Sequence, residues 1–563
     1  MKIQFKYAGS SGIVSALGTS TVAFATNVLR EPSYVSGDLA RPLVVREGLA
    51  ALHSVVISDL KYRPKDRVEF RAWLEEQDRK FLASLALKSE EIRKQIEEKE
   101  ARLEHLRALR RERMQPFFDA RRQYFDYIFH NQYELDYLLD PVITVHPDEL
   151  AFEAFSKDES SYGRLAIKYD LFKKIDAFEC GTTNVDFSSR LYKHLNRMRS
   201  YRDTHFDVSP SGFTVSTASE EGEAVHKEKK IDLPESWVQG FLQVQSVMSM
   251  GLTHLRLAPI DLFNIIRWIR RFKAKESPRA LRWELEPGKR AKVVFEPWEA
   301  AIELSPSTVY TGHKRQSIRT WGRRRLMILE RLIGSCEAID VYLAGHGLPS
   351  IYVCDLGDAT FTLGLSGWTD NDWTGESKFS LLNRKFDVDG DQLAAVYAKL
   401  REPRFATPKD LATSTGYSED VVKGALSFLC QAGRAMFDLK GGVYRHRDLF
   451  HTPFEAHKEI KKLKQAAEEA NPQAKAARQI FEKGNARLIA RRPVKTGYKL
   501  SGSVRGADGR VRPLLHVDHE GAIIEATCTC TFFKKFKLTK GPCEHMLALR
   551  LAHMKRLEEE GAA

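Results

Sequence analysis

The stretch T-C-T-C-T-F-F-K-K-F-K-L-T-K-G-P-C-E-H, residues 527–545, decides the fold of the C-terminal end of the chain. It carries two pairs of metal-ligand residues, Cys528 with Cys530 and Cys543 with His545. Thiolates combined with an imidazole are ligands that Zn²⁺ takes in a closed tetrahedral site, and the twelve residues between the pairs let the chain fold back. Because four protein ligands leave no open position for water, we predict one structural Zn²⁺ per chain rather than a catalytic metal.

The residues around these two pairs predict a small domain with its own core. Turn signals at Asp508-Gly509 and Glu520-Gly521 help to separate segments that read as strands, at residues 488–489, 498–504, 514–517 and 523–526. After the second pair, apolar residues recur at helical spacing, at Leu547, Leu551 and Met554. The C-x-C and C-x-H order, with strands before it and an apolar helix behind it, resembles the SWIM zinc finger, which we expect over residues 487–563.

A second resemblance extends along most of the chain. It rests on V-I-T-V-H-P-D-E-L (142–150), T-W-G-R-R-R-L-M-I-L-E-R (320–331), G-H-G-L-P-S-I-Y-V-C-D-L-G (345–357) and F-T-L-G-L-S-G-W-T-D-N-D-W (361–373). These stretches look like a family of bacterial SWIM proteins that is often encoded beside a MoxR-type AAA ATPase and a von Willebrand factor A protein. The resemblance implies one of those two proteins as a partner, and it assigns no role to the stretches themselves.

Composition indicates a protein of several domains without a membrane span. Hydrophobic residues make up 43% and charged residues 29% of the 563 residues, and no apolar run reaches the roughly 18 residues that a span requires. Residues 1–25 do not fit a signal peptide, because Gly, Ser and Thr interrupt their apolar part. Four cysteines outside the metal pairs are expected to be reduced core thiols. We therefore predict a cytoplasmic protein that does not associate with membranes.

The pattern of elements predicts an α+β multidomain fold. The long helical stretch has an interrupted a/d-like seam at Leu82, Leu85, Ile92, Ile96, Leu103 and Leu106. We expect the following order: an N-terminal α/β segment (1–63), a helical hairpin or coiled coil (64–140), a central α+β domain (141–385), a winged-helix-like domain (386–452), a helical connector (453–486) and the SWIM-type zinc finger (487–563).

The winged-helix prediction rests on helix caps and turns. Thr407-Pro408 predicts the start of one helix, Ser418 caps the next, and residues 440–442 form the turn of a wing. Glu419 and Asp420 lie in the first turn of the would-be recognition helix, where their charges repel phosphate. We therefore expect a structural or protein-binding role. DNA reading stays an alternative, supported by Lys423 and by two arginines of the wing, Arg445 and Arg447.

The charge distribution favours a polyanionic partner for the C-terminal end. The net charge is +13, and residues 451–563 carry 22 Lys and Arg against 13 Asp and Glu. Between the metal pairs, lysines alternate with Phe532, Phe533 and Phe536, so we predict nucleic-acid contacts at Lys534, Lys535, Lys537 and Lys540. In the alternative, the phenylalanines fill the core of the finger and the lysines are only solvated.

No catalytic motif is convincing. The chain lacks G-x-x-x-x-G-K-[ST], H-E-x-x-H and G-x-S-x-G. The group Asp355, Asp358, Asp370 and Asp372 suggests a metal-dependent nuclease, although turns explain these residues better. Basic runs at 267–273 and 323–325 are more typical of amphipathic surface helices than of phosphate sites. We predict a non-enzymatic zinc-binding interaction protein that contacts nucleic acid, DNA or RNA, or a protein. A scaffold for a MoxR-type AAA ATPase system is the alternative, and a nuclease is the weaker one.

Overall fold

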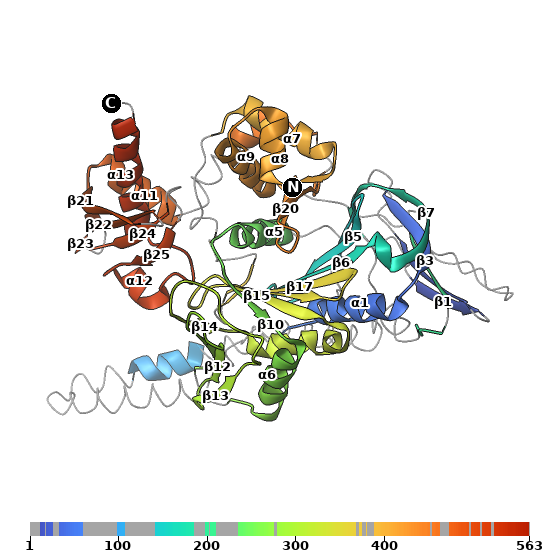
Figure 1. The fold of residues 1–563 in the computed structure, drawn as a ribbon. Helices are drawn as coiled ribbons and strands as arrows, with labels where there is room; N and C mark the ends of the chain where they lie inside the picture. The colour runs from blue at the N-terminus through green and yellow to red at the C-terminus, as the bar shows by residue number, and fades with distance from the viewer. Residues whose placement is uncertain are drawn as a thin grey trace. The chain divides into compact units, whose positions relative to one another are not determined.

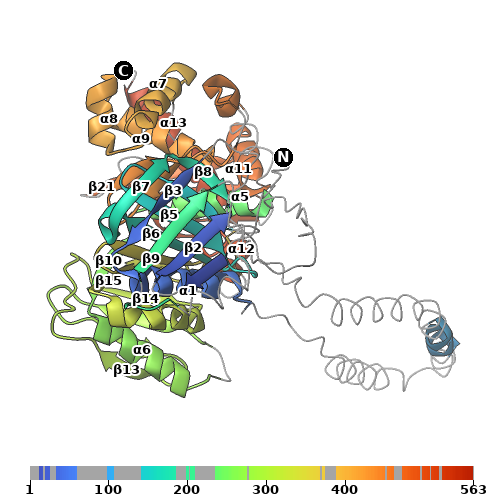
Figure 2. The same ribbon diagram turned by 90° about the vertical axis from the view of Figure 1, so that its right-hand side faces the viewer.

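A computed structural model describes most of the chain (Figures 1 and 2). The described residues are 12–16, 19–25, 33–59, 98–106, 141–184, 198–201, 203–209, 235–274, 278–367, 371–373, 379, 388–450, 453–461, 472–494, 497–506, 509–518 and 523–561. Contacts divide the chain into two compact units, Met1–Lys61 with Leu138–Ala563, and Tyr62–Tyr137.

The second unit is described only at residues 98–106, which are helical. In this helix Leu103 and Leu106 are about half exposed, at 49% and 54%. The other four residues of the a/d-like seam lie outside the described residues. The coiled coil therefore stays a prediction.

An eight-stranded antiparallel sheet forms the centre of the first unit. Its order is β10-β15-β16-β17-β6-β5-β4-β8, with bounds β10 Thr253–Leu257, β15 Ala338–Leu343, β16 Ser350–Asp355, β17 Ala359–Leu365, β6 Ser161–Lys168, β5 Glu149–Phe155, β4 Val142–Val145 and β8 Gly181–Asn184. Helix α1 (Pro42–Val56) packs on β5 and β6, where Gly48 leaves room for the side chain of Leu165. Every residue of β5 is buried, including Glu149 and Glu153.

Two smaller sheets and two further helices adjoin this core. The first sheet has the order β1-β2-β9-β3-β7, and Figure 2 shows β2, β9, β3 and β7 side by side. Its bounds are β1 Gly12–Ala16, β2 Thr19–Ala25, β9 Asp203–Ser209, β3 Tyr34–Leu39 and β7 Phe172–Glu179, and η1 (Tyr169–Leu171) precedes β7. The second is β13 Ala300–Glu303, β12 Lys292–Phe295, β11 Leu281–Leu285 and β14 Gln316–Thr320. The helices are α5 Glu235–Met248 and α6 Pro259–Arg271, and α6 packs on η2 Arg323–Ser335.

Residues 388–450 form three helices and a three-stranded sheet. The elements are α7 Gly390–Arg401, β18 Phe405–Ala406, α8 Pro408–Thr415, α9 Glu419–Gln431, β19 Ala435–Asp438 and β20 Val443–His446, with the sheet order β18-β20-β19. Thr407 and Ser418 cap α8 and α9 through their side chains, as their sequence positions predict. Gly416 ends α8 with a φ of +73°, a conformation that favours glycine.

The C-terminal sheet has the order β21-β22-β24-β25, and β23 pairs with β22. The bounds are α11 Pro472–Glu482, β21 Ala486–Val494, β22 Gly497–Gly506, β23 Gly509–Val511, β24 Leu514–Val517, β25 Ile523–Thr527, α12 Thr531–Phe536 and α13 Glu544–Gly561. Helix α13 packs on β21, β22 and β24, and α11 packs on α13 (Figure 1). All four strand segments expected from the sequence are present, whereas β23 and α12 were not predicted. Among the described helices, none combines the length and apolarity that crossing a bilayer requires.

Candidate metal centre and basic sheet face

The four predicted metal ligands meet at one end of the C-terminal sheet. Cys528 follows β25, Cys530 caps the N-terminus of α12, and Cys543 and His545 lie at the start of α13. Their ligand atoms all lie within 4.8 Å of one another. All four side chains are buried, the most exposed being Cys528 at 7%. Donor type, number and spacing therefore suit a closed four-ligand metal site.

Electrostatics at this site favour a cation. A hydrogen bond from the Cys543 thiol lowers the pKa of Cys528 to about 4, and the same contact raises the pKa of Cys543. Burial raises the pKa of Cys530. Among the described residues, neither buried ring nitrogen of His545 makes a hydrogen bond, although Nε2 lies 3.5 Å from a carboxylate oxygen of Glu544. Three thiolates cannot share this space without a positive charge between them, so the residues fit a divalent metal ion that binds thiolate and imidazole.

A glycine of the neighbouring strand makes room for the histidine ligand. A Cβ atom at Gly506 in β22 would lie 2.4 Å from Nε2 of His545, closer than Cβ atoms approach other heavy atoms. The imidazole therefore depends on a missing side chain in a strand about 40 residues away in sequence. Sequence reasoning missed Gly506, because nothing local marks it.

The segment between the two ligand pairs contains α12. Lys534, Lys535 and Lys537 are exposed, and Lys540 is half-buried. Phe533 belongs to the hydrophobic core, and its ring lies 5.1 Å from the Lys537 ammonium. The ring of Phe536 lies 4.9 Å and 5.3 Å from the ammonium groups of Lys535 and Lys540. The phenylalanines therefore pack in the finger and under its own lysines, which favours the alternative in which they fill the core. The four lysines stay predicted nucleic-acid contacts.

The face of the C-terminal sheet opposite α13 carries a set of cations that sequence reasoning missed. Residues directly opposite in neighbouring strands share a face, and here Arg492 pairs with Lys499, Arg505 with Arg510, and Arg487 with Ser503. No hydrogen bond or ion pair joins these five cationic side chains to an acidic group among the described residues. Like charges directly opposite destabilise a sheet, so this arrangement suits an anionic partner. The five cations (Arg487, Arg492, Lys499, Arg505 and Arg510) are called the basic face below.

A groove of about 420 Å³ lies on this same face. It is lined by Arg492 and Lys499 of the basic face and also by Leu514, His516 and Glu525. Glu525 is ion-paired with Lys314, whose hydrogen bond lowers the pKa of the glutamate. Glu525 is the one acidic side chain among the described residues that line the groove, and it is therefore already paired.

The two arginines that support the DNA-reading alternative, Arg445 and Arg447, are both engaged by acidic residues, which weakens that alternative. Arg445 makes two hydrogen bonds to Asp148, at 2.7 Å and 3.0 Å. Arg447 is fully buried and binds both carboxylate oxygens of Glu153 at 2.8 Å. Acidic residues beside and within β5 thus occupy the charges that would have met phosphate. Helix α9 also packs against α5, so the would-be recognition helix is partly covered.

Other candidate sites are not brought together. Asp355 is ion-paired with Lys440, and Asp358 with Arg41. Within the described residues, the only group of three or more metal-ligating side chains is the Cys528 cluster, and Asp370 lies outside them. Of the 323–325 run, Arg323 binds backbone carbonyls and Arg325 binds Asp158 at 3.0 Å, and both are buried. Four cysteines outside the metal cluster are free thiols, Cys180, Cys336, Cys354 and Cys430.

Fold and site together define a zinc-finger class of domain: a small sheet and helix joined around a closed cluster of three thiols and an imidazole. Comparison with family models identifies it, since residues 514–553 match the SWIM zinc finger. This C-terminal domain is therefore a SWIM zinc finger. A search of curated proteins found no match to the chain.

Two solved structures resemble part of the chain at low scores. Proliferating cellular nuclear antigen from Entamoeba histolytica has 11% identity and a TM-score of 0.29, over 40% of this chain and 89% of its own. The PCNA2–PCNA3 complex from Sulfolobus tokodaii has 10% identity and a TM-score of 0.30, over 44% and 96% respectively. Scores this low carry no conclusion about fold or function.

Proposed function

We propose that this protein is a non-enzymatic nucleic-acid-binding protein whose SWIM finger, held together by one Zn²⁺, binds the phosphate backbone through its basic face. The observation that carries the proposal is the cross-strand pairing of Arg492 with Lys499 and of Arg505 with Arg510, with no hydrogen bond or ion pair to an acidic group among the described residues. Bound zinc would tie β25 and α12 to the start of α13, and so keep the sheet in shape. The role of the metal is structural.

Phosphate contacts dominate the binding that this surface supports. Ser501 and Ser503 lie between Lys499 and Arg505 on this face of β22, so a backbone can approach the sheet closely. The aromatic rings of α12 are packed in the finger and under lysines, which leaves base stacking a minor role. Binding should therefore depend strongly on salt and little on sequence, because each neutralised phosphate releases a counterion.

We further propose that residues 388–450 form a winged-helix-like module with a structural role. Its wing is held against the eight-stranded sheet by Arg445 and Arg447, and Lys440 adds a pair with Asp355 at 2.7 Å. A wing held in this way has no cations left for DNA.

The test compares two charge-removing variants of the full chain. In the first, Arg487, Arg492, Lys499 and Arg505 are all replaced by Gln. In the second, the four lysines at 534, 535, 537 and 540 are replaced by Gln. Affinity for single-stranded and duplex oligonucleotides is measured by fluorescence anisotropy at several salt concentrations. The first variant should lose affinity and flatten the log–log salt slope by about 3, roughly 0.7–0.9 for each phosphate contact. Zinc content, measured in both variants, controls for folding.

Each outcome of this test shows which surface of the finger, if any, binds nucleic acid. A large loss in the α12 variant alone would move the contact surface to the lysines that the sequence predicts. Unchanged affinity and slope in both variants would contradict nucleic-acid binding by the finger. The adaptor alternative, with a MoxR-type AAA ATPase or von Willebrand factor A partner, would then move ahead, and the exposed Ile489 and Leu514 would become its first candidate contacts.

A further inference from the structure

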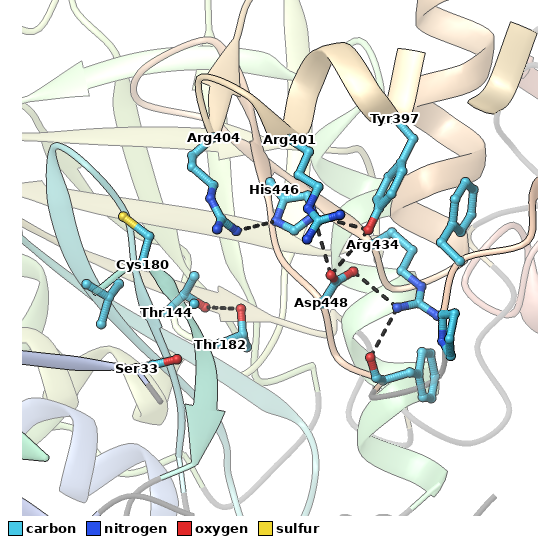
Figure 3. Close-up of a pocket in the computed structure, with 15 residues that line it drawn as sticks. Ser33, Thr144, Cys180, Thr182, Tyr397, Arg401, Arg404, Arg434, His446 and Asp448 are labelled. Carbon is cyan, nitrogen blue, oxygen red and sulfur yellow. Dashed lines mark hydrogen bonds and ion pairs between the residues drawn. The ribbon is translucent and has the colours of Figure 1, made fainter. Parts of the chain in front are cut away.

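A cavity of about 460 Å³ lies between the β4–β8 edge of the central sheet and the module that begins with α7. Figure 3 shows that its two walls differ in chemistry. One wall carries the hydroxyl groups of Ser33, Thr144 and Thr182, and the last two lie 3.4 Å apart. The other wall carries arginines, at positions 401, 404 and 434.

Within the described residues, an acidic group pairs with only one of these arginines. Arg434 donates to the Asp448 carboxylate at 3.2 Å and to the carbonyl oxygen of Phe450 at 3.1 Å. The exposed Arg401 makes no hydrogen bond or ion pair with any described residue. Among the described residues that line the cavity, Asp448 is the only acidic one, and Arg434 already engages it.

The third arginine has a neutral partner. Arg404 donates to Nδ1 of His446 at 3.3 Å, and Nε2 of the same ring lies 3.3 Å from the Tyr397 hydroxyl. Burial lowers the pKa of His446 to about 4, so the ring is uncharged near neutral pH and accepts from Arg404. Two guanidinium charges, those of Arg401 and Arg404, therefore face one cavity without an acidic partner in the part of the chain that the structure describes.

The backbone conformation of Arg404 supports a role in ligand binding for this wall of the cavity. Arg404 has a φ of +66°, in the left-handed region that favours glycine and that costs free energy for a residue with a Cβ atom. Strained residues of this kind cluster at binding sites, where the strain positions a side chain. Here the left-handed conformation directs the guanidinium of Arg404 toward the cavity, although glycine would adopt the same conformation without strain.

We propose that this cavity binds a small molecule that carries a phosphate group, of about the size of a mononucleotide. Planar guanidinium groups match the geometry of phosphate oxygens, so Arg401 and Arg404 would hold the phosphate. Thr144 and Thr182, on the opposite wall, present hydroxyls to the polar remainder of the ligand. The volume lies in the range of small-molecule sites. Burial raises the pKa of Cys180, so this wall contributes a protonated thiol rather than a nucleophile.

Ligand binding at this place joins two parts of the fold. The ligand would contact both the sheet edge and α7, so it would bind the docked arrangement of the module and stabilise it by mass action. This site is separate from the SWIM finger. Substitutions on the basic face should leave it unchanged, and failure of one proposal does not affect the other.

Isothermal titration calorimetry on the full chain tests the proposal, in phosphate-free buffer with AMP and inorganic phosphate as probes. Both probes should bind saturably, and AMP should bind more tightly. Arg401→Gln and Arg404→Gln should each weaken binding by about tenfold or more, since each removes a charge-assisted hydrogen bond. Arg324→Gln, at an exposed arginine of η2, is the matched control and should bind like the wild type.

A further variant separates binding from folding. Arg404→Gly removes the guanidinium and relieves the left-handed strain, so it should lose binding while its melting temperature without ligand stays at or above that of the wild type. Absence of saturable binding of both probes to the wild type would overturn the proposal. Wild-type affinity in both Arg401→Gln and Arg404→Gln would overturn it as well.

Discussion

Single residues decide the metal centre in two ways, by donating a ligand atom or by leaving space for one. The four ligands are recognisable because thiol and imidazole side chains at short spacing have few other uses in a small domain. Gly506 is not recognisable in this way, although its missing side chain lets the His545 ring sit against β22. The centre thus depends on one residue that the motif does not contain.

The first prediction concerns this glycine. Gly506→Ala should displace the imidazole and weaken metal binding by about 10- to 100-fold, as changes next to a ligand do. Cys530→Ser should lose the metal entirely, together with the roughly 10–16 kcal/mol that a structural zinc contributes to folding. Zinc is measured by elemental analysis after dialysis against a weak chelator.

Gly251→Ala is the matched control, because a Cβ atom there would meet nothing within 4 Å. Full retention of zinc by Gly506→Ala under conditions that strip Cys530→Ser would show that the ligand geometry tolerates the methyl group.

At the scale of elements, ion pairs with residues beside and within β5 hold the β19–β20 strand pair against the central sheet. Arg447 and Glu153 are both fully buried, and Tyr162 also donates to Glu153, at 2.6 Å. The Arg447 guanidinium lies 4.7 Å from the ring of Phe241 in α5. Buried contacts with the central sheet and with α5 therefore hold the residues that follow β20 in place.

The second prediction follows from this buried pair. Arg447→Met should lower the free energy of unfolding by about 3–5 kcal/mol, because it leaves the Glu153 carboxylate buried without a cation. Adding Glu153→Gln should restore much of the loss. Urea denaturation followed by tryptophan fluorescence measures both variants.

Lys423→Met removes the exposed pair with Glu419 in the same module and should change stability by less than about 1 kcal/mol. An Arg447→Met variant no less stable than Lys423→Met would mean that the wing is not docked on the sheet.

At the scale of the whole molecule, acidic side chains within and beside the central sheet form ion pairs with cationic side chains from residues 388–450. The pairs at Arg445 and Arg447 cross about 300 residues of sequence, with separations of 297 and 294. His446 lies among these groups, next to Asp448, Arg404 and Arg434, and it is held neutral. The docked arrangement should therefore respond to acid.

The third prediction gives the direction of this response. Burial lowers the pKa of His446 from 6.5 to about 4, although Asp448 opposes the shift. The unfolded chain therefore takes up this proton first, so the contribution to stability is complete above about pH 6.5 and is lost as the pH falls toward 4. At about pH 5.5 the loss should be about 1 kcal/mol.

We expect thermal melting to measure this contribution, with the wild type and His446→Gln each melted at about pH 7.5 and about pH 5.5 in phosphate-free buffer. The loss of stability between the two pH values is then compared between the two proteins. Metal loss in acid is common to both proteins and cancels. His313→Gln, at an exposed histidine, should behave like the wild type. Equal acid sensitivity of His446→Gln and the wild type would contradict the assignment.

The sequence by itself determined the features that depend on neighbours along the chain. Ligand spacing identified the metal cluster, and caps such as Thr407 and Ser418 placed the helix starts, because these signals act within a few residues. Four strands of the finger followed from alternation and turns. Short β23 and α12 did not, since neither carries a pattern longer than six residues.

Only the tertiary structure decided which charges are available. Arg445 and Arg447 look like wing cations in the sequence, and the fold buries them against β5, whereas strand register places Arg492 opposite Lys499 at the surface. The cavity likewise joins Thr144 and Thr182 to arginines more than 200 residues away. Whether a charge is compensated depends on contacts between distant segments, and local sequence patterns carry no record of such contacts.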